Sequence, residues 1–332
     1  MAPHPQRLTV TRRAWPLARP LATPQGVIHA VDTVVAELSD GDSRGRGEGV
    51  PLPRFGESIE SVVAALEGVK SAVPSGLDRE ALQRALPPGA ARNALDCAFW
   101  AIEANRAYCS VADLAGLGEP TPVETALTLH LDEPSAMAEL AAAHRTRPSI
   151  RLAIGGAEDL ERIQAVRQAA PAARLIVDAN EAWTPAQLRE ILGAARDLRI
   201  ELIEQPLPVE ADAALGEMEH SVPLCADESC RTVADLDRLQ GRYQVVAVKL
   251  DKVGGLTAAL ALAAEARQRG FGIMLGDTIG TSLGTAPAML LAPQADFVAL
   301  DGPTALASDR APGLRFDGGT IQPPAPAFWG GP

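Results

Sequence analysis

The chain is poor in lysine, in aromatic residues and in cysteine. Of its 30 basic residues only three are lysines, Lys70, Lys249 and Lys252. Aromatic residues make up 4% of the chain, and its four cysteines contain no Cys-x-x-Cys pair. We therefore expect reduced thiols that pack in the core of a cytoplasmic protein. Because arginine stays protonated in proteins whereas lysine can act as a base, the three lysines are candidates for chemistry.

Long apolar runs and excess positive charge are also missing. No apolar run reaches the length of about 18 residues that a membrane-spanning helix needs. The basic N-terminal stretch contains no apolar segment, which predicts that there is no signal peptide. A formal net charge of −12 argues against nucleic acid or an anionic membrane as the main partner, since both attract basic surfaces.

The first 120 residues or so predict an α+β block. Two antiparallel strands are expected over 8–17 and 27–40, followed by a loop over 45–58. Apolar residues at three- and four-residue spacing then predict helices. The expected helices cover 58–73, 78–86 and 90–108.

From about residue 123 short apolar runs alternate with helical patterns. The runs end at intervals of 22 to 28 residues, near His130, Ile154, Asp178, Glu204, Asp227, Lys249, Asp277 and Asp301. Eight such units predict an α/β fold, a (β/α)8 (TIM-like) barrel with an N-terminal α+β capping domain. We expect the cap to cover 1–122, completed by the C-terminal tail 303–332, and the catalytic barrel to cover 123–302.

Three consecutive apolar runs end in an acidic residue: LIVD at Asp178, ELIE at Glu204 and LCAD at Asp227. In a barrel of this type the carboxyl ends of the strands form the mouth that carries the active site. Neighbouring strands lie about 5 Å apart, so three bare carboxylates there would repel one another. A divalent cation relieves this repulsion, and oxygen ligands suit Mg²⁺. Three solvated loop acids are the simpler alternative, but the placement repeats on three successive strands.

Lys249 ends the next run, one strand beyond Asp227. Burial and a bound dication would both lower its pKa towards the working pH of a general base. A rim lysine in a salt bridge is the alternative reading. Lys252, in the following Gly-Gly loop, is expected at the surface. Mg²⁺ with a lysine base favours removal of a proton α to a carboxylate, through an enediolate.

These motifs resemble the enolase superfamily, in its muconate-lactonising branch, and most of all the dipeptide epimerases of the L-Ala-D/L-Glu epimerase type. The matching segments are PLARP and GRGEGVPLPRFGE near the start, then IVDANEAW, LIEQPL, ADES, VKLDKVGGL and LDGP. The resemblance implies Mg²⁺ ligands Asp178, Glu204 and Asp227, and Lys249 as one acid/base. It also implies cap loops near Gln25 and Leu52 that close over the mouth.

The family's second acid/base is the second lysine of a Lys-x-Lys motif on barrel strand two. This chain reads Arg151-Leu152-Ala153 there, so the second base is missing. His130, on the neighbouring first strand, is the candidate to replace it, with a reference pKa near 6.5. A histidine that only hydrogen-bonds in the rim is the alternative.

Other substrate positions depart from the family pattern as well. Gln25 stands where a carboxylate-binding arginine is usual, Ala299 replaces the first residue of an Asp-x-Asp pair, and Asp277 replaces an uncharged residue. The residues assigned to substrate binding are Arg151, Gln25, Asp277 and Asp301.

The sequence thus favours an Mg²⁺-dependent epimerase or racemase of a dipeptide or acylated amino acid. Two alternatives stay open: a one-base dehydratase or lyase of a small carboxylate, and a metal- and ligand-binding homologue with impaired catalysis. The expected partner is a small-molecule carboxylate, and a homo-oligomer stays open because relatives often assemble.

Overall fold

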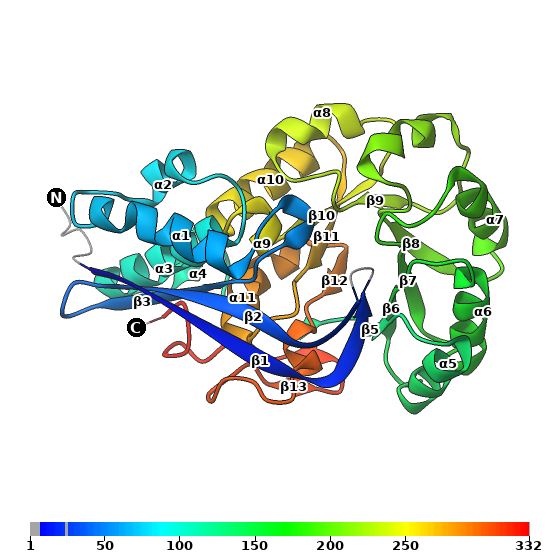
Figure 1. Cartoon of the computed structure of the whole chain (residues 1–332), viewed down its shortest axis with the longest axis horizontal. Helices are drawn as coiled ribbons and strands as arrows, with labels where there is room; N and C mark the ends of the chain where they lie inside the picture. The colour runs from blue at the N-terminus through cyan, green and yellow to red at the C-terminus, as the bar shows by residue number, and fades with distance from the viewer. Residues whose placement is uncertain (1–6, 24–25, 332) are drawn as a thin grey trace.

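A computed structural model describes residues 7–23 and 26–331. Figure 1 shows two parts, an N-terminal cap and a barrel whose strands follow one another in chain order. The cap contains one antiparallel sheet, β1 (Arg7–Thr23), β2 (Gly26–Ser39) and β3 (Arg44–Gly49). Its helices are α1 (Ile59–Val69), α2 (Arg79–Ala85), α3 (Ala90–Ala107) and α4 (Val111–Leu114).

The cap hairpin confirms the two antiparallel strands expected from the sequence. β1 and β2 pair from Arg7 opposite Ser39 to Thr23 opposite Gly26, with an irregularity between Pro16 and Leu21. This long hairpin reaches from the cap to the barrel, and its far end lies beside β5 and β6 in Figure 1. The three helices predicted for the cap are also present, as α1, α2 and α3.

Residues 44–49 form a strand, so the loop predicted over 45–58 is wrong at its start. The glycines that suggested a loop instead allow β3 to pack directly on α3. A Cβ on Gly45, Gly47 or Gly49 would lie 2.2 Å from a carbonyl oxygen of α3. Two strand residues rise about 6.6 Å and four helix residues about 6 Å, so every second strand residue meets the next turn of the helix. A bare backbone at these three positions therefore fixes the cap sheet on its helix.

The barrel confirms the predicted (β/α)8 class. Its eight strands form one parallel sheet in chain order. They are β5 (Leu127–His130), β6 (Ser149–Ala153), β7 (Arg174–Asp178), β8 (Ile200–Glu204), β9 (Leu224–Ala226), β10 (Val245–Lys249), β11 (Gly272–Gly276) and β12 (Phe297–Ala299). Each strand ends within two residues of the end that the sequence predicted.

Helices cover the outside of the barrel. They are α5 (Pro134–Ala143), α6 (Asp159–Ala169), α7 (Pro185–Ala195), α8 (Leu236–Leu239), α9 (Leu250–Val253), α10 (Leu256–Gln268) and α11 (Ser282–Thr285). Between β8 and β9 the chain forms only a 3₁₀ segment, Val209–Glu217. Another 3₁₀ segment, Ala286–Gln294, precedes β12. None of the helices in the described ranges is long and apolar enough to cross a membrane.

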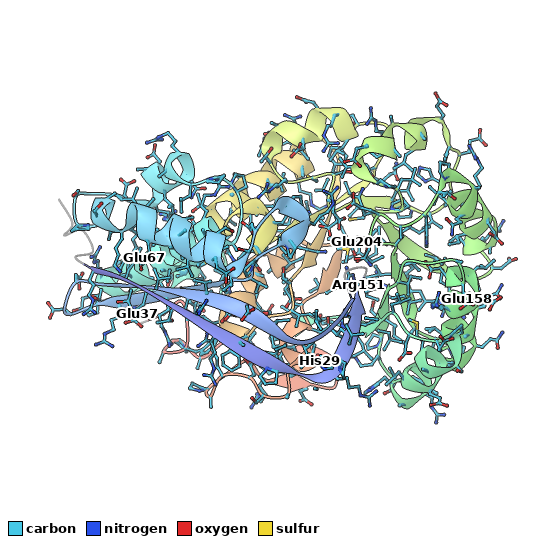
Figure 2. The ribbon with its side chains drawn as sticks, viewed as in Figure 1. His29, Glu37, Glu67, Arg151, Glu158 and Glu204 are labelled. Atoms are coloured by element: carbon cyan, nitrogen blue, oxygen red, sulfur yellow. The ribbon has the colours of Figure 1, made fainter. Side chains whose placement is uncertain are left out.

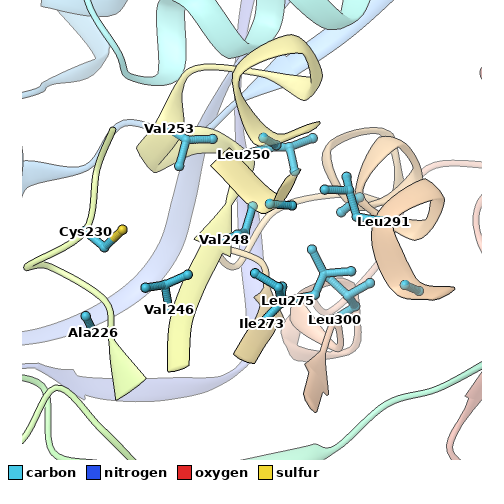
Figure 3. Packing of buried hydrophobic residues seen from close by; sticks show 14 of the residues in the cluster. Ala226, Cys230, Val246, Val248, Leu250, Val253, Ile273, Leu275, Leu291 and Leu300 are labelled. Atoms are coloured by element: carbon cyan, nitrogen blue, oxygen red, sulfur yellow. The ribbon is translucent and has the colours of Figure 1, made fainter. Parts of the chain in front are cut away.

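Alternate residues of each strand face two different cores. Val246 and Val248 of β10 pack outward against the helical layer, as Figure 3 shows. Val245 and Ala247 pack inward with the other members of a small interior cluster. That cluster consists of Ala126, Ile176, Leu202, Cys225, Val245, Ala247, Met274 and Ala299. The inward positions two residues further along the strands therefore form the floor of the mouth.

The barrel closes through a seam between β5 and β12. In the described chain these strands share no ladder, but Ala126 N–H donates to the Val298 carbonyl at 2.9 Å. At the mouth, Thr128 donates to both carboxylate oxygens of Asp301, from its N–H at 2.6 Å and its hydroxyl at 2.8 Å. The seam is thus held at its two ends, with side-chain bonds in place of strand pairing.

The C-terminal tail returns to the cap. Leu306 forms a β-bridge with Leu17, and the Trp329 indole N–H donates to the Arg46 carbonyl at 3.0 Å. The tail also adds β13 (Phe316–Asp317) and β14 (Thr320–Ile321), and β14 pairs with β4 (Val123–Glu124) ahead of the barrel.

We predict that Gly47→Ala destabilises the fold by about 3 kcal/mol, because the new methyl group would overlap the Ala94 carbonyl and push β3 off α3. Thermal or urea unfolding measures the loss. The matched control is Gly193→Ala in α7, where a Cβ meets nothing within 4 Å. This change should be neutral or stabilising by up to about 1 kcal/mol. Equal stability of the two variants would contradict the packing argument.

Candidate active site

Three carboxylates gather at the mouth because their strands place them there in register. Asp178 and Glu204 lie two residues beyond interior residues Ile176 and Leu202, and they pair with each other across β7 and β8. Asp227 lies two residues beyond the interior residue Cys225. All three side chains are buried, at 3%, 0% and 6% exposure in chain order. The structure therefore brings together the three acidic residues predicted from the sequence.

Every carboxylate oxygen of this acidic trio (Asp178, Glu204 and Asp227) accepts a hydrogen bond. Arg151 donates to Asp178 Oδ2 and, at 2.8 Å, to Glu204 Oε2. Lys249 donates to Glu204 Oε1 at 2.9 Å and to Asp227 Oδ2 at 2.6 Å. Asp178 Oδ1 accepts from the Asn180 N–H at 2.9 Å, and Asp227 Oδ1 accepts from Lys252 at 2.6 Å. Three cations thus balance three buried anions.

The Lys249 ammonium stands between two of these anions. Burial acts to lower the pKa of Lys249, but Asp227 and Glu204 outweigh it and hold this pKa well above its ordinary value. The sequence predicts that burial and a bound dication both lower this pKa, and in the structure burial acts in that direction, with a smaller effect of Arg151. The protein alone therefore favours a protonated Lys249, which can give a proton, and a further positive charge on the carboxylates is needed to make it a base.

Lys252 is buried, so its predicted surface position is wrong. Its side chain is 2% exposed and donates to Asp227 Oδ1, to the Asp227 carbonyl and to the Ala247 carbonyl, at 2.6, 2.6 and 2.8 Å. The reason is local: Lys249 ends β10, and the short helix α9 (Leu250–Val253) turns Lys252 back towards the strand ends. Lys252 is thus a positioning residue for Asp227.

Gln205 fixes the other side of the Asp227 loop. Its side-chain oxygen accepts from the Asp227 and Ser229 N–H groups at 2.9 and 3.1 Å. Its amide nitrogen donates to Ser229 Oγ, the Leu207 carbonyl and Tyr243 Oη. Gln205 is fully buried and has a φ of 34°, a strained value for a residue with a side chain. The LIEQPL motif thus supplies both an acid and the group that holds the next acid.

Glu228 is a site residue that the sequence argument missed, although it directly follows Asp227. Its Oε2 atom is buried and has no hydrogen-bond partner among the described residues. Burial and the negative charges of Asp227 and Asp178 raise the pKa of Glu228 to about 9. Two adjacent acids in the ADES segment were the available signal.

The donor chemistry of this cluster fits a hard divalent cation. In their observed positions, no three Asp, Glu, His or Cys side chains of the described chain form a preorganised metal site. The acidic trio nevertheless offers buried carboxylate oxygens from neighbouring strands, and the Glu228 Oε2 atom beside it is unpaired. A cation can use these oxygens once Arg151 and Lys249 release them.

A cavity of about 360 Å³ follows the seam and borders Arg151, whereas the acidic trio and Lys249 do not line it. Four residues predicted for the site line it: His130, Arg151, Asp277 and Asp301. The cap hairpin supplies its outer wall through residues 18–21, and α5 supplies its far end. Gln25, predicted to bind substrate, lies outside the described residues. The volume is within the range of small-molecule sites.

His130 lies on the inner face of the barrel, beside the position where the family has its second acid/base. It pairs in register with Ala153, which in turn pairs with Asp178. Burial lowers the pKa of His130, with Arg151 adding to the effect and Asp301 opposing it. Within the described ranges the imidazole makes no hydrogen bond. A neutral histidine therefore faces the cavity beside a methyl side chain.

Asp277 and Asp301 lie on the seam side of the cavity. Burial and the nearby Asp301 raise the pKa of Asp277 to about 8, so it is largely protonated at neutral pH. Its carboxyl accepts from the Thr285 hydroxyl at 2.8 Å and from the Gly302 N–H. Asp301 is engaged by Thr128 across the seam. Asp277 can therefore donate a hydrogen bond to a neutral acceptor in the cavity.

The cap is tied to the mouth by an ion pair that the sequence argument also missed. Arg54 donates through two nitrogens to Glu181, one of them at 2.8 Å to Oε1. Glu181 follows β7 with a φ of 64° and also accepts from the Val209 N–H at 3.1 Å. The LPRFG and DANE segments thus meet across the domain boundary.

Comparison with known proteins matches both parts of the chain. Residues 6–116 match the mandelate racemase / muconate lactonizing enzyme N-terminal domain. Residues 135–326 match the enolase C-terminal domain-like family.

Individual relatives match over nearly the whole chain. The L-Ala-D/L-Glu epimerase of Escherichia coli K12 is 45% identical over 94% of this chain and 98% of its own. The N-acetyl-D-glutamate racemase of a Pseudoalteromonas species is 41% identical over 90% and 95%.

Solved structures agree with the fold. An enolase family member from Agrobacterium tumefaciens with homology to dipeptide epimerases, bound to sodium and L-Ala-L-Glu, has a TM-score of 0.95, with 44% identity and coverage of 98% and 99%. The dipeptide epimerase of Enterococcus faecalis V583, complexed with Mg and L-Leu-L-Tyr, has a TM-score of 0.89, with 26% identity and coverage of 99% and 98%.

We predict that Lys252→Met lowers the free energy of unfolding by about 3–5 kcal/mol, because Asp227 would lose a buried counter-charge. Lys70→Met is the control, since Lys70 is exposed and pairs only with Glu67 on the surface. Its effect should stay below about 1 kcal/mol. Thermal unfolding of the two variants measures the difference, and a Lys252 variant as stable as the Lys70 variant would refute the positioning role.

Proposed function

The chain belongs to the mandelate racemase / muconate lactonizing enzyme family of the enolase superfamily, and we propose that it is a divalent-metal-dependent epimerase or racemase. Its substrate would be a small carboxylate, either a dipeptide or an N-acylated amino acid. The observation that carries this proposal is the placement of two acid/base side chains, Lys249 and His130, on different sides of a mouth that also holds the acidic trio.

The acidic trio would hold the metal, with Glu228 beside it. Mg²⁺ bound there would take the oxygens of the substrate carboxylate and stabilise the negative charge that develops when the α-proton leaves. The relative from Enterococcus faecalis, complexed with Mg and a dipeptide, supports this assignment.

Lys249 and His130 would serve the two faces of the substrate carbon. In the ring of eight strands β6 and β10 are four places apart, so they face each other across the mouth. Lys249 ends β10, and His130 on β5 lies next to Ala153 of β6. Inversion requires one group to take the proton and another to return it from the opposite side. The methyl side chain of Ala153 leaves room for His130 to do so.

The cavity along the seam would accept the rest of the substrate. Asp277, largely protonated at neutral pH, offers a hydrogen bond to a carbonyl such as that of an acyl group. Ala299 lines the same cavity without a charge. These features favour an N-acylated amino acid over a dipeptide with a free ammonium group, and the similarity to an L-Ala-D/L-Glu epimerase and to an N-acetyl-D-glutamate racemase is compatible with either class.

One observation favours a second function, a one-base elimination. Ala153 cannot move a proton, and loss of a β-leaving group needs only one base at the α-carbon. Lys249 alone would suffice for that reaction. Proton NMR distinguishes the two functions, because elimination yields an unsaturated product and epimerisation does not.

We predict that Lys249→Met abolishes exchange of the α-proton that faces Lys249, since Lys252, the other lysine near the mouth, is held by Asp227 and the Ala247 carbonyl. Proton NMR in D₂O with Mg²⁺, on N-acyl amino acids and dipeptides, measures the exchange. Lys70→Met, a surface control, should keep the wild-type rate. Full exchange in the Lys249 variant would eliminate both the epimerase and the lyase proposals.

We predict that His130→Ala retains α-proton exchange but slows inversion by at least about 10²-fold, the usual contribution of a positioned acid/base. The double variant His130→Ala/Ala153→Lys should recover inversion, because the lysine would stand at the neighbouring register position. His220→Ala, before β9 at the other end of the barrel, is the control. Unchanged inversion in the His130 variant would assign the second proton transfer to another group.

A further inference from the structure

Arg151 occupies an unusual position for a residue of a substrate cavity. It extends from β6 to bridge Asp178 and Glu204, which come from the next two strands. Its side chain is 12% exposed, and those of its two partners are 4% and 0% exposed. Arg151 also lines the cavity along the seam. Figure 2 labels Arg151 and Glu204 at the centre of the molecule, close to each other. The same guanidinium thus borders both the acidic trio and the cavity.

The charges of this cluster are already balanced by protein groups. When fully ionised, the acidic trio carries three negative charges, and Arg151, Lys249 and Lys252 carry three positive ones in direct contact with it. Adding a dication without any other change would leave a buried site with two uncompensated positive charges. Such an excess costs free energy in a poorly solvated site. Binding of a dication therefore calls for a cation to leave, an anion to enter or a neighbouring group such as Lys249 to lose a proton.

The hydrogen-bond donors around the acidic trio differ in how readily they can move away from its carboxylates. Asn180 donates from its backbone, and Lys252 is tied to two carbonyl groups besides its carboxylate. Within the described chain Arg151 donates hydrogen bonds only to Asp178 and Glu204, and Lys249 only to Glu204 and Asp227. Arg151 has the adjoining cavity to move into. Lys249 also bridges two carboxylates but does not line this cavity, so Arg151 is the bridging cation that has space to move into.

We propose that Arg151 is an internal counter-cation that competes with the divalent metal for Asp178 and Glu204. When a metal binds, Arg151 turns into the cavity, where it pairs with an anionic group of the substrate. The second step rests on the proposed function, and the competition itself does not. Metal and anionic substrate then bind cooperatively, since each relieves the charge imbalance that the other creates.

The test is calorimetric titration of the full-length, metal-free protein with Mg²⁺ alone, without substrate or turnover. Arg151→Met should bind Mg²⁺ about tenfold more tightly than the wild type, because the competing cation is gone. The melting temperature of the metal-free variant should fall, and saturating Mg²⁺ should raise it by more than in the wild type. Unchanged or weaker Mg²⁺ binding in Arg151→Met would overturn the proposal.

Two further variants keep the test decisive. If Arg151→Met does not fold without metal, Arg151→Lys replaces it; a lysine has one flexible ammonium group in place of the planar guanidinium fork, so it should hold Asp178 and Glu204 less firmly and also bind Mg²⁺ more tightly than the wild type. Arg174→Met is the control. Arg174 starts β7, the strand that Asp178 ends, and pairs with Glu201 at the surface. Its Mg²⁺ dissociation constant should stay within about twofold of the wild type.

The coupling to substrate is tested by repeating the titration with N-acetyl-glutamate present. The wild type should bind Mg²⁺ more tightly with this anion than without it, and Arg151→Met should lose most of that gain. An equal gain in both proteins would overturn the movement of Arg151 into the cavity. An inactive wild-type enzyme with tighter Mg²⁺ binding in Arg151→Met would refute the proposed function and leave the competition standing.

Discussion

Three carboxylates buried side by side are the constraint on which the mouth of this barrel depends. Asp178, Glu204 and Asp227 come from neighbouring strand ends, and none has enough access to water to be stabilised by solvent. Positively charged side chains compensate these anions: Arg151 from β6, Lys249 from the end of β10, and Lys252 from the turn that follows. That arrangement determines which groups can move. Lys252 is fixed by backbone carbonyls, whereas Arg151 and Lys249 are held by the carboxylates alone.

The two halves of the ring of strands have different roles: one holds the buried charges, and the other borders the cavity. From β7 to β10 the strand ends carry the buried charges, and Gln205 and Lys252 hold the Asp227 loop through its backbone. On either side of the seam, β5 and β12 lack a shared ladder in the described chain, and the cavity follows this side of the barrel. The cap hairpin covers this side through residues 18–21, which line the same cavity.

Much of this arrangement could be predicted from the sequence, because barrel strands repeat at regular intervals and their ends meet. The acidic ends of β7 and β8 and the lysine that ends β10 follow from that regularity alone. The errors have local causes. Glycines at positions 45, 47 and 49 indicate a loop unless the helix against which they pack is known. Lys252 follows a Lys-Leu-Asp segment that also suits a surface turn, and only the helical turn of α9 shows that it points back to Asp227. The division of the chain at residue 122 stays a prediction.

The departures from the family pattern are not scattered around the ring. His130 and Ala153 lie on β5 and β6, and Asp277 and Ala299 lie at the ends of β11 and β12. In the strand order these four strands flank the seam, two on each side. Four of the matching motifs, IVDANEAW, LIEQPL, ADES and VKLDKVGGL, lie instead at the ends of β7 to β10, where the charges are buried. A change of substrate would alter Asp277 and Ala299, a replaced acid/base would alter His130 and Ala153, and both would leave the second set alone. If catalysis had been lost, nothing would favour keeping the buried charges, because burying charged groups costs free energy. The distribution of the changes therefore favours an active enzyme with a different substrate over a homologue with impaired catalysis.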